Sequence, residues 1–446
     1  MNLMALLKDI FLQKKLYYCL VTIAMISVFG YFVPIIFLLS KLVLAIIISL
    51  VILDFLLLFS IKNGIGAQRI IPPRFSNGDK NIISIIISSQ YPFKVHIVVY
   101  DEIPYQFQIR DFKVEDHLLQ GIDKTITYHL KPTERGEYKF GYIKIYVSGI
   151  SGFLSKRYIC GQPGIVIVYP SFIQMKKYEF LALNNRMEEA GIKKIRQKGI
   201  HSEFDQVREY VKGDDYKSMN WKATARRGNL MVNQYQDEKS KDIYCIIDKG
   251  RLMKMPFDCL TLLDYAINSS LVLSNIALLK HDKAGLITYN TEIDCFISAE
   301  SKAGQLGKIM LALYKQETNF KESNNELLYL SLKKKIHQRS LCILFNNFES
   351  LISVRRNLKP FKELSKNHLL LIVVFENREV EQFLNMRFYE PEDLYTQVIA
   401  QKFIFDKKLI IKELKQHGIH ALYTKPQALT VNLINKYLEF KSLGMI

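Results

Sequence analysis

The chain has 446 residues, of which 49% are hydrophobic and 12% aromatic, a composition that excludes a disordered or fibrous protein. This length predicts two or three folded domains, and the mean hydropathy of +0.03 limits any membrane-embedded part to a minority of the chain. Lysine and arginine outnumber aspartate and glutamate by 61 to 43. Because no nucleic-acid-binding motif accompanies this charge, we interpret it as suited to an anionic membrane surface and predict no nucleic-acid partner.

Two long apolar runs lie near the N-terminus. Residues 16–40 contain no charged residue and residues 42–61 contain only Asp54, and each run is long enough for a spanning helix of about 20 residues. A cleavable signal peptide is an alternative for the first run, but the run is too long, no small-residue cleavage site follows it, and a second run comes at once. We therefore predict a helical hairpin over residues 1–62 that anchors the protein in a lipid bilayer. Asp54 is either functional or hydrogen-bonded to the partner helix.

Basic residues flank this anchor on both sides, whereas only Lys41 lies in the predicted connection between the two runs. The flanking residues are Lys8, Lys14, Lys15, Lys62, Arg69, Arg74 and Lys80. The positive-inside rule predicts that both ends of the anchor, and hence the soluble domains, lie in the cytoplasm at a bacterial inner membrane. The six cysteines are far apart and form no CxxC pair, which also indicates a reducing compartment, with no zinc site or disulfide framework.

Residues 68–175 alternate apolar and polar positions in short runs such as NIISIIISS and YIKIYVSG, separated by Pro, Gly and Asp. This period of two predicts an antiparallel, immunoglobulin-like β-sandwich. Residues 176–237 are charged and polar with few apolar runs, which is typical of a long connecting segment that is functional or disordered.

Strands and helices alternate over residues 238–446. Apolar strand-like runs such as IYCIID, AGLITYN, SLCILFNN and LLLIVVFE are separated by helical patterns such as LTLLDYAINSSLVLSNIALLK. This order predicts a mainly parallel sheet covered on both faces, a doubly wound α/β domain. Ligands of such sheets bind at the carboxyl ends of strands, so Asp248, at the end of the first strand, occupies a candidate ligand position.

The usual catalytic motifs are missing. The sequence has no GxxxxGK[ST], HExxH or GxSxG, and no GxGxxG after a strand, so we expect no enzyme activity, no cofactor and no small-molecule substrate. The densest polar cluster runs from His201 to Arg227. In one interpretation its acids pair with nearby arginines and hold a docking or interdomain segment together. In the alternative, a hydrolase would use His201, Glu203 and Asp205 as metal ligands or acid–base groups. The near balance of acids and bases and the single histidine favour the first interpretation.

The run GIHSEFDQVREYVKGDDYKSMNWKATAR resembles the signature of the domain of unknown function 58 family. The matching positions are Glu203, Phe204, Arg208, Glu209, Tyr210, Gly213, Asp214, Asp215, Trp221, Ala225 and Arg226. Lys217 and Met219 replace the more usual Arg and Ile. The resemblance implies two transmembrane helices, a β-sandwich and a von Willebrand factor A-like domain. It further implies a membrane-tethered scaffold whose signature docks a MoxR-type AAA+ ATPase or other von Willebrand A proteins.

Domains of the von Willebrand A type often hold a divalent metal through a D-x-S-x-S motif, completed by a later Thr and Asp. Asp248 matches the first position, but Gly250 and Leu252 replace the two serines, and Asn347 stands about where the later Asp falls. The resemblance therefore implies a degenerate adhesion site without metal. This opposes a second alternative, a metal-dependent adhesion protein that faces outward.

Overall fold

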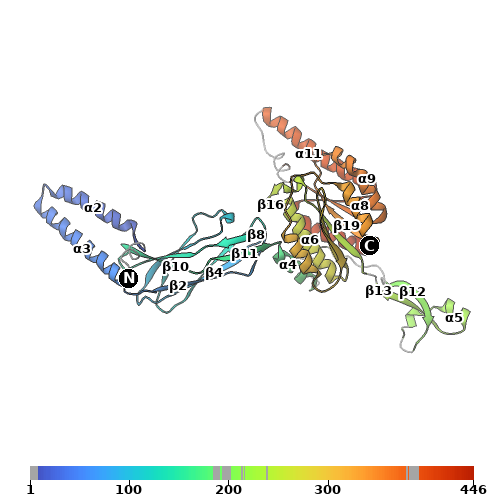
Figure 1. The fold of residues 1–446 in the computed structure, drawn as a ribbon, viewed down its shortest axis with the longest axis horizontal. Coiled ribbons are helices and arrows are strands. Elements are labelled where there is room, and N and C mark those ends of the chain that lie inside the picture. The colour runs from blue at the N-terminus through green and yellow to red at the C-terminus, as the bar shows by residue number, and fades with distance from the viewer. Residues whose placement is uncertain are drawn as a thin grey trace. The chain divides into compact units, whose positions relative to one another are not determined.

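The computed structural model describes residues 9–183, 191–192, 202–211, 214, 216–237, 240–377, 380 and 391–446. The chain separates into two compact units, Met1–Tyr169 and Pro170–Ile446 (Figure 1). The first unit contains both the predicted anchor helices and the predicted sandwich.

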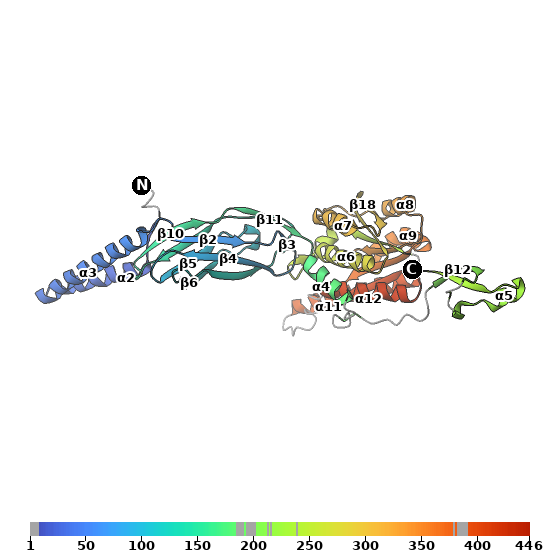
Figure 2. The same cartoon turned by 90° about the horizontal axis from the view of Figure 1, so that it is seen from below.

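Two helices, α2 (Lys14–Gly30) and α3 (Pro34–Phe59), pair through a hydrogen bond of 3.0 Å between the Ser27 and Ser40 hydroxyls (Figure 2). The prediction that Lys41 lies in the connection between two apolar runs was wrong, because the helices are separated at residues 31–33 and Lys41 lies inside α3. The physical reason is Pro34, which lacks an N–H and disfavours a helical conformation of the preceding residue. Val33 is accordingly extended, and Pro34 takes the first helical position.

Two helices of the described residues are long and apolar enough to cross a membrane, α3 and α6 (Leu262–Leu279). They differ in burial: only 11% of the apolar window of α3 is covered, against 83% for α6. Helix α6 is therefore a core helix of the second unit. Helix α3 exposes a long apolar surface of the kind that marks a contact with lipid or protein.

The rest of the first unit is a β-sandwich, as predicted, although one of its strand pairs is parallel and not antiparallel. One sheet has the order β1-β10-β9-β5-β6, with β1 (Ile10–Leu12), β10 (Leu154–Cys160), β9 (Ile143–Ser148), β5 (Val95–Asp101) and β6 (Lys113–Leu118). Two three-stranded sheets, β2-β4-β7 and β3-β11-β8, complete it, with β2 (Ile65–Ile70), β4 (Asn81–Ser89), β7 (Lys124–Leu130), β3 (Arg74–Ser76), β11 (Gly164–Tyr169) and β8 (Gly136–Phe140). Alternate side chains are buried in one core, such as Ile83, Ile85 and Ile87 of β4. The sequence prediction missed β1, which adds an edge strand from residues that precede the helices.

The second unit begins with α4 (Phe172–Leu183), and a β-hairpin follows later in the chain. The hairpin consists of β12 (Ser202–Glu209) and β13 (Met231–Asp237), and between them lie η3 (Tyr216–Ser218) and α5 (Trp221–Arg227). Residues 176–237 were predicted as a connecting segment, but their described part contains these strands and helices. The hairpin strands, SEFDQVRE and MVNQYQD, are largely polar, so they lack the run of apolar residues by which strands are predicted.

A six-stranded sheet of order β18-β17-β14-β19-β20-β21 forms the core of this unit. Its strands are β14 (Asp242–Asp248), β17 (Lys283–Tyr289), β18 (Ile293–Glu300), β19 (Leu341–Phe345), β20 (Leu369–Phe375) and β21 (His420–Thr424), and only β18 is antiparallel to its neighbour. One face packs on α4, α6, α7 (Gln305–Tyr314) and α12 (Leu429–Ser442). The other packs on α8 (Asn325–Lys335), α9 (Leu351–Asn367) and α11 (Pro391–Gln416). The mainly parallel, doubly covered sheet predicted from the sequence is confirmed.

The strand order places a crevice at one point of this sheet. The chain runs from β14 outward to β17 and β18, and then returns to the other side of β14 with β19. At such a reversal, the connections after the two central strands lead away in opposite directions, which leaves an opening at their carboxyl ends. Asp248 ends β14 at this position.

Candidate functional site

The tip of the β12–β13 hairpin carries most of the described signature residues. Helix α5 is capped at its start by Asn220, whose Oδ1 accepts a hydrogen bond of 3.0 Å from the Ala223 N–H. It ends at Gly228, which has a φ of 77° and donates its N–H to the Thr224 carbonyl at 2.9 Å. The Thr224 hydroxyl then accepts from the Met231 N–H at 3.0 Å, which ties α5 to the returning strand.

An ion pair closes the turn that leads into this tip. Arg208 donates two hydrogen bonds to the Asp214 carboxylate, with N–O distances of 2.9 and 2.7 Å, and Asp214 also accepts from the Val211 N–H at 2.9 Å. These donors lower the pKa of Asp214, the Arg208 contribution being the largest. One of the expected pairings of an acid with an arginine therefore occurs within the described part of the signature. Glu209 takes a different partner, accepting a hydrogen bond of 3.3 Å from the Asn229 side chain.

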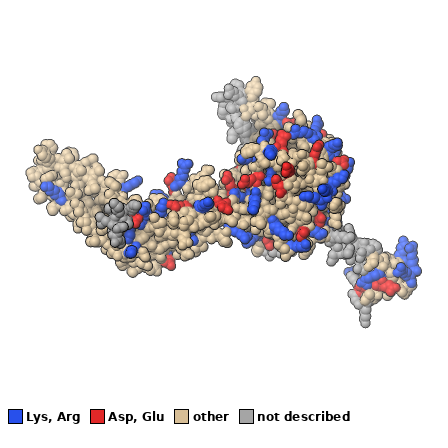
Figure 3. Space-filling view, viewed as in Figure 1, with Lys and Arg blue, Asp and Glu red and all other residues tan. Residues whose placement is uncertain are grey.

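Aromatic and basic side chains of the tip face solvent. Trp221 is 68% exposed and Tyr216 is 73% exposed, and Lys222, Arg226 and Arg227 of α5 are exposed as well. Figure 3 shows the Lys and Arg side chains gathered over α5. We call this set, Tyr216, Trp221, Lys222, Arg226 and Arg227, the hairpin patch. Tyr210 lies next to it, with its ring 6.1 Å from that of Tyr216.

Several predicted site residues lie outside the described part of the chain. These are His201, Gly213 and Asp215, together with the side chains of Glu203, Phe204 and Asp205, whose backbones belong to β12. The proposed hydrolase cluster of His201, Glu203 and Asp205 thus stays a prediction.

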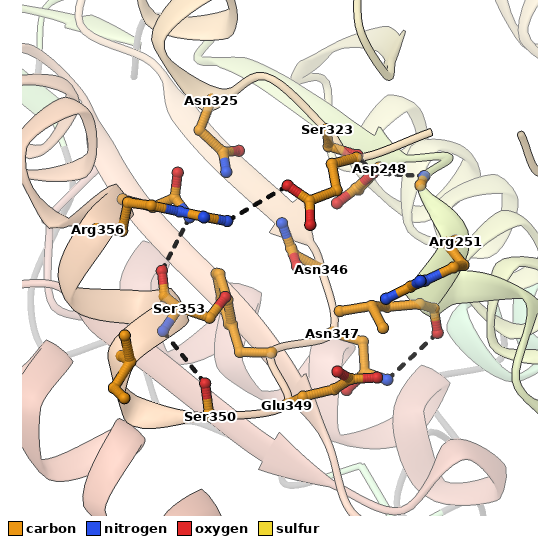
Figure 4. A pocket seen from close by; sticks show the side chains of 16 residues that line it. Asp248, Arg251, Ser323, Asn325, Asn346, Asn347, Glu349, Ser350, Ser353 and Arg356 are labelled. Atoms are coloured by element: carbon orange, nitrogen blue, oxygen red, sulfur yellow. Dashed lines mark hydrogen bonds and ion pairs between the residues drawn. The ribbon is translucent and has the colours of Figure 1, made fainter. Parts of the chain in front are cut away.

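A second polar site lies at the carboxyl ends of β14 and β19. A pocket of about 260 Å³ is lined there by Asp248, by residues that follow each strand, and by residues that precede or begin α8 and α9 (Figure 4). Asp248 is only 5% exposed, and burial raises the pKa of its carboxyl to about 6. Its Oδ1 accepts hydrogen bonds from the Gly250 N–H at 2.7 Å and from the Ser323 hydroxyl, which lower the pKa only in part.

The residues at the positions of the adhesion motif contact one another and neighbouring residues. A Cβ atom at Gly250 would lie 2.4 Å from the Ser323 Oγ, so no side chain fits at the first serine position unless Ser323 moves. Asn347 donates to the Leu252 carbonyl at 3.3 Å, and its Oδ1 accepts from the ammonium of Lys407 at 2.8 Å. Within the described residues, no group of three or more His, Cys, Asp or Glu is arranged to hold a metal ion.

Lys407 of α11 is a buried cation that sequence reasoning missed. It donates to the Asn347 side chain and to the Phe348 carbonyl, and burial lowers its pKa to about 8. Ser323, which holds Asp248, was missed as well. Neither residue carries a local signal, because one lies on an amphipathic helix and the other in a polar loop before α8.

Comparison with known proteins finds similarity over part of this chain. "Uncharacterized protein YeaD" of Bacillus subtilis (strain 168) is 24% identical over 204 residues, which cover 44% of this chain and half (50%) of YeaD. The crystal structure of the conserved hypothetical protein BatB from Bacteroides thetaiotaomicron is 12% identical and covers 46% of this chain and 100% of BatB, with a TM-score of 0.27. A CARDB domain from Pyrococcus furiosus is also 12% identical and covers 24% of this chain and 94% of its own, with a TM-score of 0.17. At TM-scores this low, the structural likeness supports no assignment of fold or function. Residues 206–395, which include most of the hairpin and the pocket at Asp248, match the family described as "Protein of unknown function DUF58".

Proposed function

We propose that this protein is a non-enzymatic, membrane-anchored scaffold or adaptor that docks a partner protein through the hairpin patch. The observation that carries the proposal is the exposure of Trp221 and Tyr216 next to two arginines on a well-supported tip. Tryptophan, tyrosine and arginine are the residues that most often supply binding energy in protein interfaces.

The described part of the tip is supported by contacts within the hairpin itself. The Asn220 cap, the Gly228 end and the Arg208–Asp214 pair all hold it through local hydrogen bonds. Binding to such a surface loses little conformational entropy, which favours affinity. In this proposal the Arg208–Asp214 ion pair positions the hairpin patch and does not itself contact the partner.

The partner that fits this surface is acidic, because the charged side chains of α5 are all basic. By resemblance to the domain of unknown function 58 family, we propose a MoxR-type AAA+ ATPase or another von Willebrand A protein. We propose that the whole chain belongs to this family. In this proposal the α/β domain is von Willebrand A-like and has a degenerate adhesion site. Helices α2 and α3 span the inner membrane, and the sandwich and α/β domain lie in the cytoplasm. The uncovered apolar surface of α3 supports the anchoring.

Affinity purification of the full-length protein from its native membrane, followed by mass spectrometry, tests the docking. We expect Trp221→Ala to reduce recovery of the partner at least about tenfold, the size of a typical hot-spot effect. Tyr395→Ala is the matched control, because Tyr395 is an equally exposed aromatic residue on α11 at 76% exposure. Equal recovery by the wild type and by Trp221→Ala would contradict docking through the hairpin patch.

A charge reversal tests the positioning role of the ion pair. We expect Arg208→Asp and Asp214→Arg each to weaken partner recovery, because each leaves two like charges at hydrogen-bond distance. The double variant restores a pair of opposite charges and is expected to recover much of the binding. If the single variants bind as well as the wild type, the pair does not position the patch.

A further inference from the structure

Asp54, the charged residue in the second apolar run, meets a loop of the sandwich. It lies near the end of α3, is fully buried, and accepts hydrogen bonds of 3.2 Å from the N–H groups of Ser151 and Phe153, as well as one from the Ser151 hydroxyl. A Cβ atom at Gly149 would lie 2.6 Å from the Asp54 Oδ1. The loop of residues 149–153 is therefore packed directly on the carboxylate.

Other contacts fasten the helices to the same end of the sandwich. The buried ammonium of Lys156 donates to the carbonyls of Leu58 and Ile61, at 3.1 and 2.8 Å, and so caps the end of α3. At the start of α2, the Gln13 N–H donates to the Phe153 carbonyl at 3.0 Å. Because both helices are hydrogen-bonded to the sandwich, the position of the 149–153 loop along the helix axes is fixed.

The 149–153 loop lies close to the start of α2 and to the end of α3. Helix α3 ends at Phe59, five residues beyond Asp54, which corresponds to about 7.5 Å along the helix axis. Phe153 packs against the cluster that contains Leu16, in the first turn of α2. If α3 crosses a bilayer, the loop lies within the outer 5–10 Å or so of the layer, where amphipathic segments bind.

One side chain of this loop is largely uncovered by the described residues. Ile150 is 67% exposed, and its neighbour Gly149 lies against Asp54 of α3. Lys14 and Lys15, at the start of α2, are exposed at the same level and are suited to contact lipid phosphates. The loop thus presents an apolar tip and nearby cations, the combination that fits a membrane surface.

We infer that the 149–153 loop is a lipid-contacting loop, with Ile150 inserted at the boundary between headgroups and acyl chains. The partner is the bilayer that α3 enters, because the loop that carries Ile150 is bonded to that helix at Asp54. Asp54 then satisfies loop N–H groups that would otherwise face hydrocarbon, where unpaired backbone donors are costly. This inference rests on the proposed membrane anchoring.

The test uses single-tryptophan variants of the full-length protein in vesicles of phosphatidylcholine and phosphatidylglycerol. Trp221→Phe removes the native tryptophan, and a new one is placed at Ile150, at Leu56 or at Ile165. Leu56 is 62% exposed on α3 and reports on insertion of that helix, whereas Ile165 is 61% exposed on β11, in the sandwich. Fluorescence is compared in vesicles of ordinary lipid and of lipid brominated near the headgroup end of the acyl chain.

We expect roughly twofold quenching for Ile150→Trp and for Leu56→Trp, and none for Ile165→Trp. Quenching at Leu56 without quenching at Ile150 would overturn the inference and leave the anchoring intact. Absence of quenching at both positions would overturn the anchoring and the inference together. Quenching at Ile165 as strong as at Ile150 would also overturn it, because contact would not be specific to this loop. Adding Asp54→Asn to Ile150→Trp should reduce the quenching, since the amide places a donor against the loop N–H groups.

Discussion

Replacement of Asp248 by asparagine measures whether this carboxyl is a ligand or a neutral structural group. The structure shows a buried side chain with two hydrogen-bond donors and a pKa raised to about 6 by burial. Both donors bind the same oxygen, Oδ1, so the amide oxygen of an asparagine keeps both bonds. Asp248→Asn therefore removes the charge and little else.

The magnitude and its pH dependence follow from the raised pKa. The difference between about 6 in the folded state and the ordinary value of 3.8, at about 1.36 kcal/mol per pH unit, corresponds to about 3 kcal/mol. Below pH 3.8 the carboxyl is protonated in both states, and the stability linked to its proton is fully present. This stability is lost as the pH rises through about 6, because the folded state must then hold a buried charge. We expect Asp248→Asn to stabilise the second unit by up to about 3 kcal/mol at pH 8 and to have little effect near pH 4.

Thermal unfolding of the full-length protein in nonionic detergent, at pH 4 and pH 8, is the assay. For a unit of this size, about 3 kcal/mol corresponds to a rise in Tm of about 5 °C or more. Asp294→Asn is the control, because it removes a partly exposed carboxylate of the same unit, paired with Lys249 at 2.7 Å, and is expected to change Tm little. A lower Tm for Asp248→Asn at pH 8, or a rise in the wild-type Tm by several degrees on addition of Mg²⁺, would refute the reasoning. Either result would show an ionised Asp248 that binds a cation, as the adhesion-site alternative requires.

Two further predictions concern the junction between α3 and the sandwich. Gly149→Ala is expected to lower the Tm of the first unit, because its Cβ would lie 2.6 Å from the Asp54 Oδ1. The control is Gly164→Ala, which is expected to leave the Tm unchanged because its Cβ would meet nothing within 4 Å. Equal Tm values for the two variants would show that the loop shifts to accommodate the added methyl group. Lys156→Met removes the donor to the Leu58 and Ile61 carbonyls, and chemical denaturation is expected to show a loss of about 1–3 kcal/mol. An unchanged midpoint would mean that water, or the Tyr91 hydroxyl at Leu58 and the Tyr158 hydroxyl at Ile61, satisfies these carbonyls.

The sequence by itself determined the secondary structure wherever apolar residues follow a regular period. The strands from IYCIID to LLLIVVFE appear where they were predicted, because a buried strand must be apolar on both faces. The alternating runs of β4 and β9 likewise predicted a sandwich. The break before α3 was also readable, since proline restricts its own backbone and that of the residue before it. A count of apolar residues alone began the second run at residue 42, eight residues after Pro34, where α3 begins. The polar hairpin escaped prediction because its strands are held by main-chain hydrogen bonds that leave no pattern of apolar residues.

Only the tertiary structure decided which polar groups meet. Asp54 binds Ser151, 97 positions away, and Asp248 binds Ser323, 75 positions away. Such pairs depend on how whole elements pack, and no local pattern of residues encodes them. The same holds within the signature, where Arg208 pairs with Asp214 and not with its neighbour Glu209, because the turn at Val211 brings the former within reach. Residue types thus predicted that charged groups gather in the signature and that a single carboxyl lies in the anchor, while the fold determined their partners and hence their roles.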